Sequence, residues 1–198
     1  MKIDEELLYS FGAELKTIKA KEAIFKENEV PIYYFQIVDG TVKENHYDLD
    51  GKEFIHNILS CGQSFGDSML FVEKNYPFNA IALKDCKILK LHKDQFFALL
   101  KQYPEVSIHA QSCLSHRLFY NIIMTQNIAS QNPETRLKGL MSYLKSFQTN
   151  DEQFTFQIHF TRQQIADLTG LRVETVIRAI KKMEQNKVLK IKDRKIFY

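Results

Sequence analysis

The stretch that decides the fold lies near the C-terminus and reads 161-TRQQIADLTGLRVETVIRAIKKME-184. Thr161 and Gln164 stand three residues apart, which is the spacing of a capping box at the start of a helix. Thr169-Gly170 ends that helix after about two turns, because glycine readily adopts the left-handed conformation of a tight turn. A second helix follows at once, so the stretch predicts two helices joined by a turn.

Apolar residues recur on one face of each predicted helix. They are Ile165, Ala166 and Leu168 in the first helix and Val176, Ile180 and Met183 in the second. Ala166, Gly170 and Val176 have the spacing of a helix-turn-helix, which needs a small residue for close helix contact, a glycine for the turn and a branched residue that fixes the second helix. A plain helical hairpin in a bundle would show a similar apolar pattern and is the alternative.

The outer face of the second helix carries polar and charged side chains. They are Arg172, Glu174, Thr175, Arg178, Lys181 and Lys182. Glu174 and Arg178 are neighbours four residues apart, so one interpretation is an exposed ion pair worth a few tenths of a kcal/mol. The other is base reading in a major groove, where Arg donates to guanine and Glu accepts from cytosine. Because phosphates repel a Glu that is not bonded to a base, the pattern favours base reading.

The last residues, 188-VLKIKDRKIFY-198, alternate as two short strands around Lys192-Asp193-Arg194. This predicts a basic β-hairpin suited to a phosphate backbone. Together with the two helices, the hairpin makes a winged helix-turn-helix.

The basic charge of the chain is concentrated in its last third. Net charge is −3 over residues 1–133, with 14 Lys/Arg and 17 Asp/Glu, and +6 over residues 134–198, with 13 and 7. Asn132-Pro133 marks the change, because Asn favours a helix N-cap and Pro the first helical turn. We expect three parts: a β-rich domain over residues 1–104, a long helix over 105–131 and a DNA-binding domain over 132–198.

The composition fits a protein that folds without disulfides. Of the 198 residues, 44% are hydrophobic and 26% are charged, which is ordinary for a globular protein. The three cysteines, Cys61, Cys86 and Cys113, form no CxxC pair and fit a reducing cytosol. The acidic N-terminus does not resemble a signal peptide, and no run approaches about 18 apolar residues. We expect a cytoplasmic protein without membrane contact.

Residues 17–92 contain a series of short predicted strands. The runs are 22-EAIFKENE, 33-YYFQIVDG, 41-TVKENHYD, 53-EFIHNILS, 80-AIALKD and 86-CKILKLH. Gly40, Asp50-Gly51 and Gly62 separate apolar runs at a spacing of roughly ten residues, which is typical of an antiparallel barrel or sandwich. A short amphipathic helix is predicted over residues 3–15, so the fold class is α+β.

A long helix is predicted over residues 105–130, which contain no Gly or Pro. Ser115, Leu118, Ile122, Thr125 and Ala129 follow heptad-like spacing, and other apolar residues occupy neighbouring faces. One interpretation is a core helix of a single domain. The other is a helix that packs on its own β-domain with one face and on a twin helix with the other, which predicts a homodimer.

The order of β-domain, long helix and winged helix-turn-helix resembles the cyclic-AMP receptor protein and fumarate–nitrate reduction regulator (Crp/Fnr) family of bacterial transcription regulators. The segment T-R-Q-Q-I-A-D-L-T-G-L-R-V-E-T-V-I-R resembles the family's T-R-Q-E-I-A…G…V/R-E-T-V-x-R pattern, and I-V-D-G-T-V-K, D-G-K and C-G-Q-S-F-G-D carry the glycines of its β-region. The resemblance implies an N-terminal cyclic-nucleotide-binding-like β-roll (jelly-roll), a long dimerisation helix and a C-terminal winged helix-turn-helix. It also implies a homodimer on an inverted repeat of double-stranded DNA, with RNA polymerase as a further partner.

The resemblance also assigns roles within the DNA-binding stretch. It places Val173, Glu174 and Arg178 at base-reading positions and Ile177 at a neighbouring position that tunes the site. The same resemblance makes Thr161, Arg162 and Gln163 phosphate contacts.

The family's cyclic-nucleotide cassette reads F-G-E and, further on, R-S/T-A; here it is 65-FGDSMLFVEKNYPFNA-80. Asp67 replaces the Glu, Asn79 replaces the Ser/Thr, and Phe78, or Pro77 in a shifted alignment, replaces the Arg. Without that Arg, a phosphodiester loses the charge-assisted bonds that offset its desolvation, so we expect that cyclic AMP is not the effector. The degenerate pocket comprises Phe65, Gly66, Asp67, Ser68, Phe78, Asn79, Ala80 and, on the long helix, Asn121.

No cofactor and no metal are expected. The iron–sulfur branch has a cysteine cluster near the N-terminus that this chain lacks, and His46, His56 and His92 are scattered along the sequence. A cupin-like enzyme is disfavoured because no H-x-H, H-x-x-x-H or nucleophile elbow occurs. The remaining alternative is a protein-interaction module whose β-roll and winged helix are not used for DNA.

Overall fold

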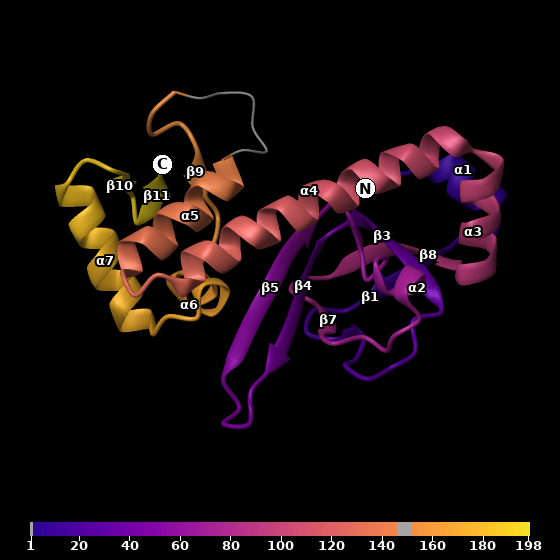
Figure 1. Ribbon diagram of the computed structural model, residues 1–198, viewed down its shortest axis with the longest axis horizontal. Helices are drawn as coiled ribbons and strands as arrows, with labels where there is room; N and C mark the ends of the chain where they lie inside the picture. The colour runs from indigo at the N-terminus through magenta and orange to yellow at the C-terminus, as the bar shows by residue number, and fades with distance from the viewer. Residues whose placement is uncertain (1, 146–151) are drawn as a thin grey trace. The chain divides into compact units, whose positions relative to one another are not determined.

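The computed structural model describes residues 2–145 and 152–198 and divides into two compact units (Figure 1). The first unit ends at Ser115 and the second begins at His116. This division falls inside the long helix α4 (Pro104–Ala129), which therefore contributes residues to both units. The first unit contains two sheets and the second contains one, and each unit has buried apolar side chains of its own.

The first unit is a β-roll with short helices at its ends. Its helices are α1 (Glu5–Ser10), α2 (Met69–Val72) and α3 (Lys93–Gln102), followed by the first part of α4. Its strands are β1 (Glu14–Ile18), β2 (Ala23–Phe25), β3 (Tyr33–Asp39), β4 (Thr41–Tyr47), β5 (Glu53–Ser60), β6 (Ser64–Phe65), β7 (Asn79–Ala82) and β8 (Cys86–His92).

The strands form two antiparallel sheets, with the orders β1-β8-β3-β6 and β2-β7-β4-β5. One buried cluster contains side chains of both sheets, among them Phe35, Val42 and Ile88. A second cluster joins Leu89 and Leu91 of β8 to α1, α3 and the first part of α4. Successive strand residues point to opposite faces of a sheet. Ile88 of β8 therefore belongs to the first cluster, whereas Leu89 and Leu91 belong to the second. The strand spacing predicted an antiparallel barrel or sandwich, and the structure has a β-roll of two antiparallel sheets.

Gly40 shows why a glycine separates β3 from β4. Its φ is +110°, and a Cβ built there would lie 2.8 Å from the Cα of Cys86. A side chain would therefore meet the backbone of β8, so this turn needs glycine for its conformation and for its close approach.

Several sequence predictions in this unit need correction. The helix predicted over residues 3–15 ends at Ser10, because Gly12 adopts a φ of +89° and the chain enters β1 at Glu14. The strand predicted from residue 22 is limited to Ala23–Phe25. The short elements β6 and α2 were not predicted, since two to four residues carry too little periodicity to detect.

The second unit contains the rest of α4, three further helices and a small sheet. The elements are α5 (Pro133–Lys145), β9 (Gln157–Ile158), α6 (Arg162–Thr169), α7 (Val173–Gln185), β10 (Lys190–Lys192) and β11 (Lys195–Phe197). Asn132 caps α5 as predicted, since its side-chain oxygen accepts from the Glu134 amide at 2.9 Å. The predicted hairpin is β10 and β11, and β9 adds a third, unpredicted strand beside β11.

The helix-turn-helix is also confirmed in its details. Thr161 and Gln164 form both bonds of the capping box at the start of α6, and Gly170 ends that helix with a φ of +66°. Val176, Ile180 and Met183 are almost completely buried, so α7 packs through the predicted face. Among the described residues, no helix is long and apolar enough to cross a membrane.

Candidate nucleic-acid interface

The exposed face of α7 carries most of the predicted DNA-binding residues. Arg172, Glu174, Ile177, Arg178, Lys181 and Lys182 are exposed, whereas Val173 and Thr175 are half-buried. Arg172 stands at the N-cap of α7, so the set runs along the helix from its first turn to its last. Ile177 is 40% exposed and is the one large apolar side chain on this polar face.

Glu174 and Arg178 do not form an ion pair with each other. Neither side chain has a hydrogen-bond or ion-pair partner within the described ranges. The intrahelical ion pair that the sequence allowed is therefore absent, and both side chains are free to reach a ligand.

Lys182 differs from Lys181 in its surroundings. Its Nζ lies 2.6 Å from Oε1 of Glu134 on α5, and that carboxylate is mostly buried. Lys182 thus helps to join α5 to α7. Lys181 is exposed and is the better candidate for a phosphate contact.

The start of α6 and the hairpin lie close together. A guanidinium nitrogen of Arg162 donates to the backbone oxygen of Arg194 at 3.4 Å, and burial lowers the pKa of Arg162. Thr161 and Gln163 are exposed beside it, and Gln163 donates to Asp167 at 2.8 Å. Of the predicted phosphate contacts, Arg162 therefore meets the turn of the β10-β11 hairpin.

Two residues that the sequence did not single out hold this arrangement. Glu184 on α7 accepts from the amide of Ile191 at 3.0 Å and fixes the hairpin against the helix. Arg136 on α5 donates to the backbone oxygen of Thr169 at 3.4 Å, at the end of α6. Neither lies in a motif, because each role depends on a partner from another element.

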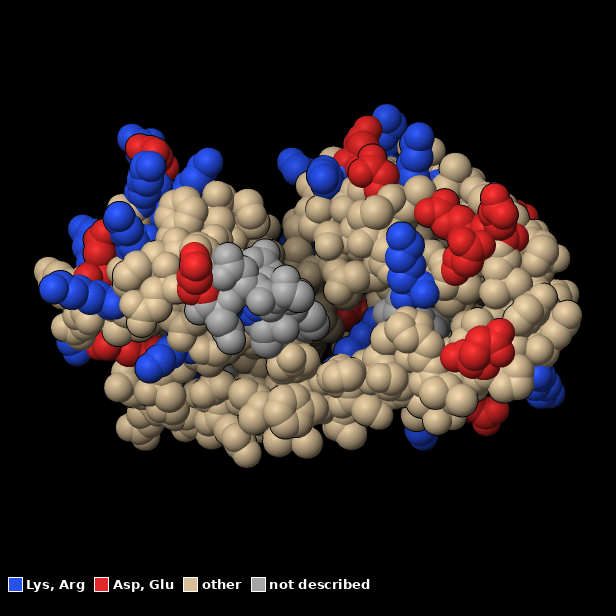
Figure 2. All heavy atoms as spheres, turned by 90° about the horizontal axis from the view of Figure 1, so that it is seen from above, with Lys and Arg blue, Asp and Glu red and all other residues tan. Residues whose placement is uncertain are grey.

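Basic side chains are frequent on the surface of this unit. Figure 2 shows Lys and Arg atoms over the C-terminal unit, at the left of the view, with some carboxylates between them. The hairpin adds Lys190, Lys192, Arg194 and Lys195, all exposed. Such a surface attracts a polyanion such as the phosphate backbone of DNA.

The degenerate cyclic-nucleotide cassette lies in the first unit and is filled by the protein's own side chains. The amide of Gly66 donates to Oε1 of Glu44 at 3.1 Å, and Asn57 donates to Oε2 of the same carboxylate at 2.7 Å. Glu44 is 5% exposed. The carboxylate of Glu44 on β4 thus occupies the backbone N–H of Gly66 in the cassette.

Aromatic rings close the space beside this amide. The rings of Phe25 and Tyr76 stack with centroids 3.6 Å apart, and a Cβ built on Gly66 would lie 2.8 Å from Phe25. Phe65 and Ala80 are fully buried in the same core. Aromatic and apolar side chains therefore pack against the cassette at Gly66.

The remaining cassette residues are held by internal bonds. Asp67 is 3% exposed and accepts from Ser64 at 2.9 Å. Asn79 accepts from the amide of Glu27 and donates to the backbone of Asn45. Ser68 and Phe78 are half-buried, and Asn121 is exposed on α4 in the second unit.

The scattered histidines include one adjacent pair. Nδ1 of His46 lies 3.0 Å from Nε2 of His56, because strands β4 and β5 are neighbours. Burial is the main cause of a lowered pKa for His56. Within the part of the chain that the structure describes, no group of three or more His, Cys, Asp or Glu side chains could hold a metal ion.

Both parts of the chain match models of known protein families. Residues 15–103 match the model of the cyclic nucleotide-binding domain, and residues 135–197 match that of the Crp-like helix-turn-helix domain. The cAMP-activated global transcriptional regulator CRP of Haemophilus influenzae is 27% identical over 172 residues, which cover 86% of this chain and 77% of that protein. The transcriptional activatory protein AadR of Rhodopseudomonas palustris is 23% identical, covering 86% and 71%.

Solved structures share the fold over nearly the whole chain. FixK2 of Bradyrhizobium japonicum superposes with a TM-score of 0.76 at 19% identity, covering 93% of this chain and 91% of that one. A variant of CooA from Carboxydothermus hydrogenoformans superposes with a TM-score of 0.81 at 15% identity, covering 100% and 87%. With a β-roll, a long helix and a Crp-like helix-turn-helix in this order, the chain belongs to the Crp/Fnr family of transcription regulators.

Proposed function

We propose that this regulator binds an inverted repeat in double-stranded DNA as a homodimer, with α7 of each protomer in a major groove. The observation that carries the proposal is the face of α7 on which Glu174 and Arg178 are exposed and unpaired among the described residues. Both can reach base edges, whereas Lys181 and the hairpin are suited to phosphates. The relatives are transcription regulators, so the proposal includes no catalytic step. It also places the protein in the cytoplasm, with RNA polymerase as a further partner.

Exposed apolar residues on α4 support the homodimer. Leu118, Phe119 and Ile122 are 63%, 56% and 49% exposed and lie within two turns of one another. Such a patch on a helix is costly in water and typical of an interface. A second copy of the same helix offers the matching surface in a symmetric dimer.

Selection of bound sequences from a random pool of duplex DNA tests this function. We expect enriched sites with two inverted half-sites whose centres are about 10–10.5 bp apart or a multiple of that. Affinity for the selected site should fall steeply with salt, because phosphate contacts release counterions. If the pool stays random and no salt-dependent binding is found, the winged helix serves a protein partner and the proposal is wrong.

We also propose that cyclic AMP is not the effector. The amide of Gly66 is already bonded to Glu44, and Phe78 stands where the family has Arg. A phosphate entering the cassette would meet the carboxylates of Glu44 and Asp67, and the charged groups would repel one another while losing water.

Thermal unfolding with cyclic AMP checks this expectation. Millimolar cyclic AMP should change neither the Tm nor the affinity for the selected DNA, whereas the Haemophilus influenzae regulator, as a positive control, should respond. Binding at 100 times Kd would stabilise the fold by about 2.7 kcal/mol, or roughly 5–10 °C for a chain of this size. A clear shift that disappears in Asp67→Ala would contradict the proposal.

A further inference from the structure

The side chain of Ile177 on α7 is the one exposed large apolar group in the C-terminal part of the described chain. Among residues 133–145 and 152–198, no other large apolar side chain is exposed, whereas Ile177 is 40% exposed. On the same helix, Val176 and Met183 are almost completely buried. This part of the protein therefore leaves a single large apolar group open to a ligand.

Ile177 stands among the residues that are suited to base edges and phosphates. At 3.6 residues per turn, it lies about 60° from Glu174 and about 40° from Lys181 around the helix axis. Val173, four residues earlier, is half-buried and its neighbour on the same side of the helix. A lone exposed apolar side chain is ordinary on a protein surface. Here, however, it lies on the helix face that enters the major groove under the proposed function.

The major groove offers one apolar group to such a side chain. Guanine, cytosine and adenine present hydrogen-bond donors and acceptors there, whereas thymine presents its C5-methyl group beside an acceptor oxygen. An isoleucine placed against a donor or an acceptor would displace water from that group without replacing the lost hydrogen bond, which is unfavourable. Against the methyl group, it removes apolar surface from water on both sides of the contact, which is favourable.

The neighbouring side chains are not suited to this contact. Glu174 and Arg178 can form hydrogen bonds with cytosine and guanine, and Lys181 is suited to a phosphate. A charged group that faced a methyl group would lose hydration without gaining a bond. Recognition of a methyl group in the half-site therefore needs an apolar side chain, and Ile177 is the exposed residue of α7 that provides one.

We propose, on the basis of the proposed binding to duplex DNA, that Ile177 reads the C5-methyl group of one thymine in each half-site. The contact selects a T·A pair beside the pairs that Glu174 and Arg178 read. It depends on the methyl group and not on hydrogen bonds, so 5-methylcytosine also provides it and uracil does not.

Exchange of single thymines for uracil in the selected site tests the proposal, because this exchange removes the methyl group and leaves base pairing unchanged. Each thymine of the half-site, on either strand, is exchanged at both symmetric positions, and the affinity of the full-length protein is measured by titration. We expect one position at which the exchange weakens binding about fourfold per half-site, or roughly 15-fold for both half-sites together, as the loss of one buried methyl group allows.

Ile177→Ala completes a thermodynamic cycle with the uracil exchange. Alanine is a good helix former, so α7 should remain folded. The variant should bind the thymine site less tightly by at least the factor seen with uracil, and the uracil exchange should then have no further effect. Ile177→Val keeps a branched apolar side chain and should keep most of the preference. Lys181→Ala is the matched control, because it should weaken binding to all sequences and keep the full effect of uracil.

A cytosine at the same position gives an independent readout. The T·A pair is changed to C·G, and the cytosine is compared with 5-methylcytosine. The unmodified protein should bind the methylated site roughly 15-fold more tightly than the unmethylated site, and Ile177→Ala should bind the two sites equally.

Several outcomes would overturn the proposal. It is wrong if the selected half-site contains no thymine, if no uracil exchange weakens binding, or if the loss persists in Ile177→Ala. It is also wrong if Ile177→Ala weakens all sequences alike, as a contact with deoxyribose would. These failures would leave the proposed binding of an inverted repeat standing, since Glu174 and Arg178 would still set a base preference. Absence of any sequence-specific binding would contradict both the contact and the proposed function.

Discussion

Replacing both Leu118 and Ile122 by Glu is expected to convert the regulator into a monomer with greatly weakened binding to its inverted repeat. The two side chains are 63% and 49% exposed, so the charges should leave the fold of each unit intact. In a dimer they would face the partner helix, where four added carboxylates repel one another and lose water.

The loss of affinity should be large because the two recognition helices would no longer be linked. Linking two binding modules raises affinity by about 10²–10⁴-fold over one module, so the double variant should lose a factor of this size on the full site. Binding to an isolated half-site should hardly change. Sedimentation gives the mass, and titration of full and half sites gives the affinities.

A conservative exchange at the same positions is the control. Leu118→Ile combined with Ile122→Leu keeps the apolar area and should remain dimeric with nearly full affinity. The dimer through α4 would be refuted if the Glu variant kept both the mass of a dimer and full affinity for the inverted repeat.

Replacing Arg178 by Ala is expected to reduce both affinity and specificity. Arg178 is exposed on α7, free of an intramolecular partner within the described residues, and close to Glu174 on the same face. A bidentate contact from Arg to guanine is worth about 1–3 kcal/mol, so each half-site should lose roughly 5–150-fold in affinity. Preference should relax at one base pair per half-site.

Lys181→Ala provides the comparison. A phosphate contact carries no base information, so this variant should weaken binding to all sequences alike and reduce the salt slope by about one for each protomer. Competition among variant sites at several salt concentrations measures both effects. If Arg178→Ala kept its full base preference while losing affinity uniformly, α7 would not be the reader and the β10-β11 hairpin would take that role.

The winged helix-turn-helix was predictable because its determinants are local. Thr161 and Gln164 cap α6, Gly170 permits the turn, and Val176 starts the buried stripe of α7, all within sixteen residues of one another. The hairpin at Asp193-Arg194 is equally local, and both residues have positive φ in the structure. Local hydrogen bonds and a period of 3.6 or 2 residues are written directly in a sequence. The elements β6, β9 and α2 have only two to four residues, which is too few to show such a period, so the sequence did not predict them.

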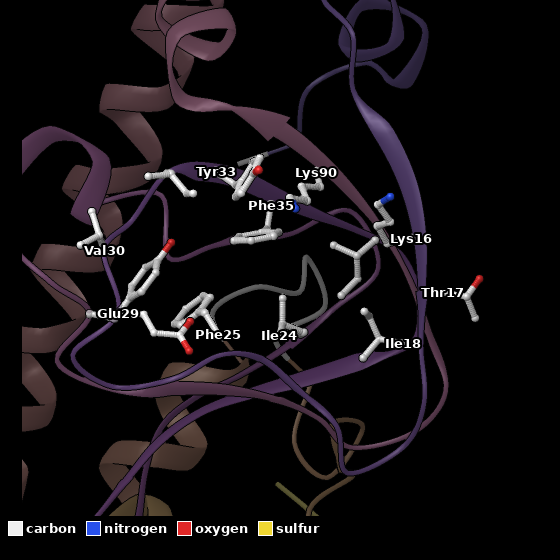
Figure 3. Close-up of a pocket in the computed structure, with 13 residues that line it drawn as sticks. Lys16, Thr17, Ile18, Ile24, Phe25, Glu29, Val30, Tyr33, Phe35 and Lys90 are labelled. Atoms are coloured by element: carbon white, nitrogen blue, oxygen red, sulfur yellow. The ribbon is translucent and has the colours of Figure 1, made fainter.

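The state of the cyclic-nucleotide cassette depended on contacts between distant segments. The sequence showed that Phe78 and Asp67 depart from the family's cassette, but it did not show that Glu44, 22 residues before Gly66, binds the Gly66 amide. Likewise, Lys16 and Lys90 line one cavity of the β-roll because β1 pairs with β8 in a particular register (Figure 3). The amino-acid sequence by itself therefore determined the family, the order of elements and the candidate DNA-reading face. Strand register and side-chain packing between distant segments decided which groups fill the cassette and which line this cavity, because a shift of one residue in register would move each side chain to the opposite face.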